Sequence, residues 1–138
     1  MKYLKLLLIP ATLLLLSGTC RETATGGDNT SILPVNSYIT VTKGDLVREV
    51  YFDSVVMDNR CPPNVNCIVA GEGVCRFTIK NGKQSQQVTL STYPGGTGVA
   101  RYPNEADVSG LRIRLEALTP FPRGTYNDYK AQVVITVL

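Results

Sequence analysis

Short runs of β-branched and aromatic residues, broken by turn residues, constrain the fold of this chain most strongly. The clearest case is the alternating run 74–80, which Asn81-Gly82 follows directly. Asn-Gly is the strongest short hairpin signal, because a type I′ turn needs positive φ at both central residues. A two-residue loop at Asn81-Gly82 sets Cys75 opposite Val88 and predicts an antiparallel hairpin.

Other segments have the same texture, and we find no convincing helix after residue 20. The additional strand-like segments are residues 38–42, 46–57, 111–117 and 129–138. The run 46–57 is the longest, and we expect a bulge in it near Asp53-Ser54. Together the patterns predict a single all-β domain over residues 35–138, a compact antiparallel sandwich or barrel of about six to seven strands.

The first twenty residues predict a location outside the cytoplasm. Lys2 and Lys5 bracket a short basic start, and an almost unbroken apolar run follows from Leu6 to Leu16. Small and polar residues then lead to Cys20. The run is shorter than the about 20 residues that a transmembrane helix needs, and Pro10 disfavours a helix interior. This layout is typical of a bacterial secretory signal peptide.

The segment Leu16-Ser17-Gly18-Thr19-Cys20 resembles a lipobox, in which the cysteine is acylated and becomes the mature N-terminus. It departs from the usual pattern at Thr19 and Ser17. The resemblance implies a lipoprotein signal peptide over residues 1–19 and a lipid on Cys20. Arg21 rather than Asp follows the cysteine, which by analogy with lipoprotein sorting favours the outer membrane of the cell envelope, facing periplasm or exterior. The alternative is ordinary cleavage nearby, which leaves a soluble periplasmic domain.

Residues 20–34 are polar and glycine-rich, and we expect them to form a flexible tether between membrane and domain. The chain has 14 basic and 11 acidic residues; Lys2 and Lys5 leave with the signal, so 12 basic residues remain against 11 acidic ones. This near balance gives no electrostatic case for nucleic-acid binding. We expect the membrane as a partner through the lipid on Cys20, and an unidentified protein as a second partner.

Histidine is absent, which removes Ser-His-Asp and Cys-His catalysis and histidine-ligated metal sites. The near-neighbour acid pairs, Asp53 with Asp58 and Glu105 with Asp107, are most simply solvated turn residues. The oxygen-rich segment 104–107 lacks the spacing of a calcium loop. We expect that the protein is not an enzyme and that it binds no cofactor and no metal ion.

Four cysteines in an oxidising compartment predict disulfide chemistry. If Cys20 carries lipid, three cysteines remain and one is left over. Residues 62–66 turn by composition and could bring Cys61 and Cys67 together. Cys75 shares a strand face with Phe77, and we expect it to be a small core residue.

Residues 58–73 resemble a motif of small uncharacterised bacterial lipoproteins, Asp-Ser-Arg-Cys-Pro and then, a few residues later, Val-x-Cys-Val-Trp-Ala-Gly-Glu-Ala. The matching positions are Asp58, Arg60, Cys61, Pro62, Val65, Cys67, Ala70, Gly71 and Glu72. Asn59 replaces Ser, and Val69 replaces Trp. Leu118-Thr119-Pro120-Phe121-Pro122 is similar to a later Leu-x-Pro-x-Pro of the family. The resemblance covers most of residues 38–138 and implies one all-β domain with a Cys61–Cys67 disulfide, but no activity.

The leading hypothesis is a lipid-anchored, non-catalytic domain of the cell envelope with a binding or structural role. We expect Asp58 to accept hydrogen bonds from nearby backbone N–H groups and Arg60 to pair with a carboxylate. In the alternative, the disulfide loop presents Pro63, Asn64 and Val65 to a protein partner, as in disulfide-loop protease inhibitors. Rigid loops bind at a lower entropic cost.

Overall fold

The structure is a computed structural model, which describes residues 23–25, 29–93, 102–122 and 126–138. The expected signal peptide over residues 1–19 and the expected lipid site at Cys20 lie outside these residues. Across the described ranges, no helix has the length and the apolar character needed to span a bilayer.

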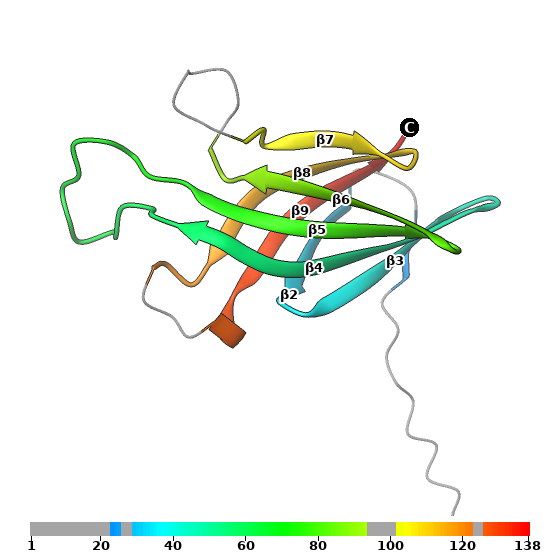
Figure 1. The fold of residues 1–138 in the computed structure, drawn as a ribbon, viewed down its shortest axis with the longest axis horizontal. Helices are drawn as coiled ribbons and strands as arrows, with labels where there is room; N and C mark the ends of the chain where they lie inside the picture. Colours follow the sequence, from blue (N-terminus) through cyan, green and yellow to red (C-terminus); the bar gives the residue numbers. More distant parts are fainter. Residues whose placement is uncertain (1–22, 26–28, 94–101, 123–125) are drawn as a thin grey trace, which may run out of the picture.

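The described residues form two packed β-sheets, which confirms the expected all-β sandwich (Figure 1). One sheet has the order β1 (Thr23–Thr25), β3 (Ser37–Lys43), β4 (Leu46–Asp58), β5 (Gly73–Asn81) and β6 (Gln84–Ser91). The other has the order β2 (Asn29–Pro34), β9 (Lys130–Val137), β8 (Leu111–Thr119) and β7 (Glu105–Val108). Neighbouring strands are antiparallel except β1 and β3. A short 3-10 helix, η1 (Tyr126–Asp128), precedes β9.

The core lies between the inner faces of the two sheets, because apolar side chains alternate with polar ones along the strands. Phe52 and Phe77 are fully buried there, and their ring centroids stack 5.2 Å apart. Cys75 is also fully buried and free, which confirms that it is a core thiol. Burial raises the pKa of this thiol to about 12, so it stays protonated and unreactive at neutral pH.

The structure corrects the expected tether over residues 20–34, because Asn29–Pro34 forms strand β2. Leu33 lies opposite Ala131 of β9 and is fully buried, and Val35 just after the strand is buried too. The segment is polar on average, and this average concealed Leu33, which shares a face with Val35 two residues later. The folded domain therefore begins before residue 35.

The β5–β6 hairpin turns one residue later than expected. Asn81 pairs with Gln84, so Gly82 and Lys83 are the central residues of the turn. Gly82 has φ 58°, as the first central residue of a type II′ turn requires. Cys75 consequently lies opposite Leu90 instead of Val88. Because the pairing shifts by two residues, every side chain keeps its predicted face.

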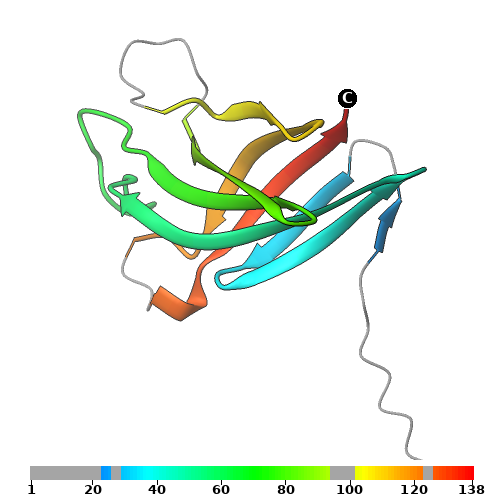
Figure 2. The ribbon, with the colours of Figure 1, turned by 45° about the vertical axis from the view of Figure 1, so that its right-hand side comes forward.

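Strand β4 contains two register shifts, one between Phe52 and Ser54 and one between Val55 and Met57. The first confirms the bulge expected near Asp53-Ser54. Beyond the bulged part of β4, a long connection leads to β5 at one end of the sandwich (Figure 1). The backbone of β1 pairs beside the β3–β4 hairpin at the opposite end (Figure 2). The β4–β5 connection therefore lies at one end of the domain, and strand β1 with the β3–β4 hairpin lies at the other.

Candidate functional site

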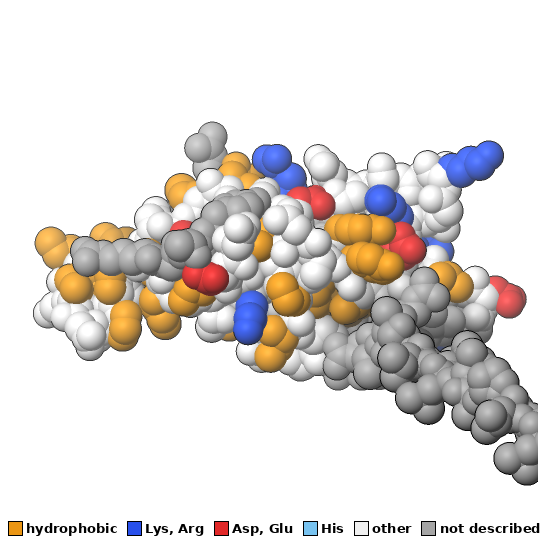
Figure 3. Space-filling view, turned by 90° about the horizontal axis from the view of Figure 1, so that it is seen from below, with side chains coloured by type: hydrophobic (Ala, Val, Ile, Leu, Met, Phe, Trp, Pro, Cys, Tyr) orange, Lys and Arg blue, Asp and Glu red, His pale blue; other side chains and the backbone are white. Residues whose placement is uncertain are grey.

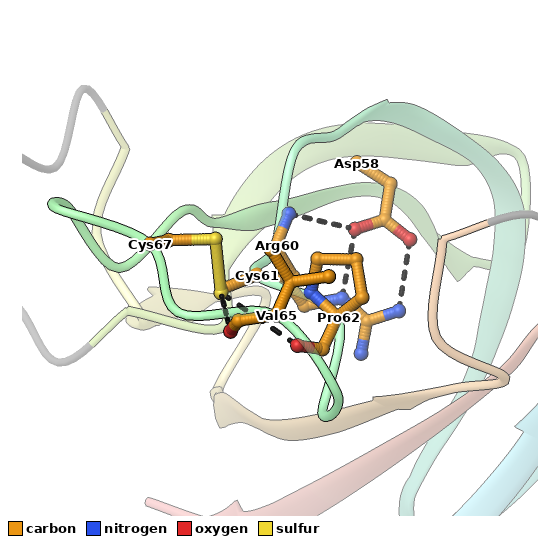
Figure 4. Close-up of a disulfide and its surroundings, with 6 residues drawn as sticks. All are labelled: Asp58, Arg60, Cys61, Pro62, Val65 and Cys67. Atoms are coloured by element: carbon orange, nitrogen blue, oxygen red, sulfur yellow. Dashed lines mark hydrogen bonds and ion pairs between the residues drawn. A yellow bond between two sulfur atoms is a disulfide. The ribbon is translucent and has the colours of Figure 1, made fainter.

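The connection between β4 and β5, residues 59–72, is closed by a disulfide. Cys61 and Cys67 are bonded, with 6.0 Å between their Cα atoms, which confirms the predicted pairing (Figure 4). Inside this ring the N–H of Val65 donates to the carbonyl of Pro62 at 3.1 Å. A covalent bond and a backbone turn thus restrict the same few residues.

The predicted partner-facing residues lie in that ring. Pro63, Asn64 and Val65 are all exposed, with 56% of Val65 accessible to solvent. Their backbone belongs to, or adjoins, the turn that the disulfide encloses. The structure therefore places them where a partner could contact them.

The base of the loop is held by an ion pair between Asp58 and Arg60. Nε of Arg60 donates to Oδ1 of Asp58 and Nη2 donates to Oδ2, both at 2.8 Å (Figure 4). The backbone N–H of Arg60 also donates to Oδ1 at 3.3 Å. The side chains are only 9% exposed for Arg60 and 6% for Asp58. Both roles expected from the sequence are confirmed, in a bidentate and buried form.

The same guanidinium joins the loop to the second sheet. Arg60 donates through Nη1 to the carbonyl of Leu118 in β8 and through Nη2 to that of Pro120 at 2.6 Å. Its guanidinium lies over the Phe121 ring, 4.8 Å from the centroid. Just before β9, Tyr129 donates its hydroxyl to Oδ2 of Asp58 at 3.0 Å. One ion pair therefore fastens the loop to three separate parts of the chain.

The Asp58 carboxyl is predicted to make stability depend on pH. Burial raises the pKa of Asp58, but the hydrogen bonds from Arg60 and Tyr129 outweigh burial, and the pKa lies below its ordinary value. A lowered pKa in the folded state stabilises the fold at pH above the unfolded pKa, and this contribution is lost as pH falls. We expect the free energy of unfolding to drop between about pH 5 and pH 2.

Urea denaturation across that range measures the effect. The Asp58→Asn variant, although less stable at every pH, should lose less stability on acidification than the parent protein. Parallel pH profiles of the two proteins would contradict the assignment.

A second set of contacts closes the loop where its two ends meet. Asn59 donates its backbone N–H to the carbonyl of Glu72 at 3.0 Å, and the N–H of Glu72 donates to Oδ1 of Asn59 at 2.7 Å. The hydroxyl of Ser91 donates to the Glu72 carboxylate at 2.5 Å. A Cβ on Gly71 would lie 1.7 Å from the carbonyl oxygen of Asn59, so only glycine fits.

Exposed apolar side chains gather around this loop. Ten large hydrophobic residues are exposed among the described residues, and six of them lie in the loop or beside its base. These six are Val56, Met57, Val65, Ile68, Val69 and Phe121. Figure 3 shows hydrophobic side chains over the end of the molecule that carries the loop. We call Val65, Ile68 and Val69 the apolar tip.

Of the apolar tip, the sequence pattern predicts only Val65 as a partner-facing residue. Ile68 is fully exposed, with a relative accessibility of 104%, and Val69 is 61% exposed. A usable signal was present, because residues 61–71 contain no charged side chain while prolines and a glycine keep them out of the sheet. An apolar segment of this kind has no strand face on which to be buried.

Removing the disulfide is predicted to lower stability moderately. The double variant Cys61→Ser/Cys67→Ser frees a seven-residue ring, for which the chain-entropy relation gives about 2.4 kcal/mol. The variant should still fold, because the bonds of Arg60 and Asn59 remain. Urea denaturation of the variant and of the parent protein measures the change, and loss of the folded state would contradict the independence of these contacts.

The acid pairs considered for chemistry are used locally. Glu105 and Asp107 lie in strand β7 instead of a turn, and Arg112 donates to both Asp107 oxygens at 2.7 and 2.8 Å. Asp58 is buried in its ion pair, and Asp53 accepts the Thr78 hydroxyl at 2.6 Å. Within the part of the chain that the structure describes, no three His, Cys, Asp or Glu residues are grouped to hold a metal ion.

The fold and the site define an all-β sandwich domain with a disulfide-closed loop at one end. Comparison of the chain with protein families, with curated proteins and with solved structures finds no match. The resemblance of residues 58–73 to bacterial lipoproteins stays a prediction.

Proposed function

We propose that this protein is a lipid-anchored, non-catalytic domain of the cell envelope that binds a protein partner through its disulfide loop. One observation carries the proposal: a loop fastened by buried polar bonds exposes the apolar tip. Clustered apolar side chains on a surface are typical of interaction sites. A loop that is already held loses little conformational entropy on binding.

The arrangement of the domain supports an anchored binding role. Strand β1 is the described element that follows the expected lipid site at Cys20 in the sequence, and it pairs with Thr40–Thr42 beside the β3–β4 hairpin. The disulfide loop lies at the other end of the sandwich (Figure 2). A chain anchored through Cys20 would therefore hold the apolar tip away from the membrane surface.

Intact-mass analysis of the membrane fraction tests the anchor. We expect a mature protein that begins at Cys20, carries added acyl mass and contains one disulfide. An unmodified protein that begins elsewhere would refute the anchor and favour the soluble periplasmic alternative.

A second candidate function, inhibition of a protease, is favoured by the turn inside the disulfide ring. The Val65–Pro62 hydrogen bond and the disulfide hold Asn64 and Val65 in a fixed, exposed turn, as a loop that enters an active-site cleft requires. Assays against a panel of serine and cysteine proteases test it. Inhibition that Val65→Asp abolishes would support this function, and no inhibition at micromolar concentration would remove it.

A further inference from the structure

We infer that the apolar tip binds a protein groove that is itself apolar and uncharged; this rests on the proposed function. Residues 61–71 contain no charged side chain. Of the charged residues on either side, Arg60 is buried in its ion pair with Asp58, and the Glu72 carboxylate accepts a hydrogen bond from the Ser91 hydroxyl at the base of the loop. Residues 61–71 therefore offer a partner apolar contacts and the side-chain amides of Asn64 and Asn66, but no charged group that would attract an opposite charge.

A groove that carried a charge would match this surface poorly. Ile68 and Val69 would cover the charged group without replacing its bonds to water, which is unfavourable. Complementary potentials across an interface favour a neutral partner for a neutral patch. The same reasoning favours apolar side chains opposite Ile68, whose whole surface is available for burial.

A lipid surface fits this tip less well than a protein does. Segments that bind membrane surfaces combine apolar side chains with Lys or Arg that contact anionic headgroups. The apolar tip has no such neighbour in residues 61–71. Strand β1 also lies at the opposite end of the domain, which directs the tip away from an anchoring membrane.

A second copy of the chain fits less well for a geometric reason. Copies anchored in one membrane would hold their tips side by side and pointing the same way. Face-to-face contact between two tips would require one copy to turn over. A different protein, located beyond the anchoring membrane, can meet the tip face to face without such a rotation.

Panning of a displayed random-peptide library on the purified mature protein tests the inference. We expect enriched peptides to be apolar and to lack charged residues. Binding of these peptides, measured by fluorescence polarisation, should weaken about tenfold or more for Ile68→Asn. The matched control is Ile32→Asn, because Ile32 is 63% exposed on β2, outside the disulfide loop, and should leave binding unchanged. Both replaced side chains are exposed, so neither change threatens the core.

Several results would overturn the inference. They are enrichment of charged peptides, no enrichment, or equal binding by Ile68→Asn and the parent protein. Vesicles of phosphatidylethanolamine and phosphatidylglycerol that carry the anchored protein can be mixed with protein-free vesicles. If the two kinds of vesicle bind each other and Ile68→Asn abolishes this binding, the apolar tip binds a lipid surface instead. Sedimentation that shows Ile68-dependent dimers would assign a second copy. If the protein carries no acyl chain but still selects apolar peptides, the lipid anchor is refuted and the inference of an apolar, uncharged partner groove stands.

Discussion

Replacing Arg60 with methionine should lower the free energy of unfolding by about 3–5 kcal/mol, the range for breaking a buried ion pair by removing one partner. Methionine keeps much of the side-chain volume, so the loss is mainly electrostatic. The Asp58 carboxylate would stay buried without its cation, and the carbonyls of Leu118 and Pro120 would lose a donor. Equilibrium denaturation in urea measures the change.

The matched control is Arg112→Met, which removes the same charge from an exposed pair. Arg112 and Asp107 are 48% and 50% exposed, although their hydrogen bonds are equally short. Solvent screens such a pair, so we expect Arg112→Met to lower the free energy of unfolding far less than Arg60→Met does. Equal losses for the two variants would contradict the importance of burial at Arg60.

Gly71→Ala should cost about 3 kcal/mol, the upper range for inserting an atom into a packed site. The new Cβ would lie 1.7 Å from the carbonyl oxygen of Asn59, which is backbone and cannot rotate away. The loop ends would have to separate, and the two hydrogen bonds between Asn59 and Glu72 would break. Urea denaturation gives the energy, and loss of amide protection at Asn59 and Glu72 gives the location.

Gly44→Ala is the matched control for the crowding argument. Gly44 has φ 57°, and a Cβ there would meet nothing within 4 Å. The cost should therefore be only the backbone term, about 1–2 kcal/mol. If Gly71→Ala costs no more than Gly44→Ala, close contact does not explain the glycine at position 71.

The fold class could be predicted because its signals are local. The two-residue period of β5 and β8 separates buried from exposed side chains within each strand. The bulge near Asp53 was also predictable from the segment itself. The β5–β6 pairing was not, because Asn81-Gly82 allows a turn centred on either of two neighbouring pairs, and the structure uses Gly82 and Lys83.

The unpredicted features depend on distant parts of the chain. Strand β2 has few apolar residues and is stabilised by pairing with β9 at the other end of the sequence. The disulfide and the Asp58–Arg60 pair were predictable because the partners are close in sequence. The bonds from Arg60 to Leu118 and from Tyr129 to Asp58 were not, because no local pattern reports a contact across about 60 to 70 residues.

Backbone order parameters from ¹⁵N relaxation test most directly whether the disulfide loop is held as a rigid binding surface. We expect residues 61–71 to have values near the rigid-backbone level of about 0.85, like the strands β4 and β5 that flank them. Values below about 0.6 across these residues would show a flexible loop. The apolar tip would then have no fixed geometry to present, which would contradict the proposed binding role.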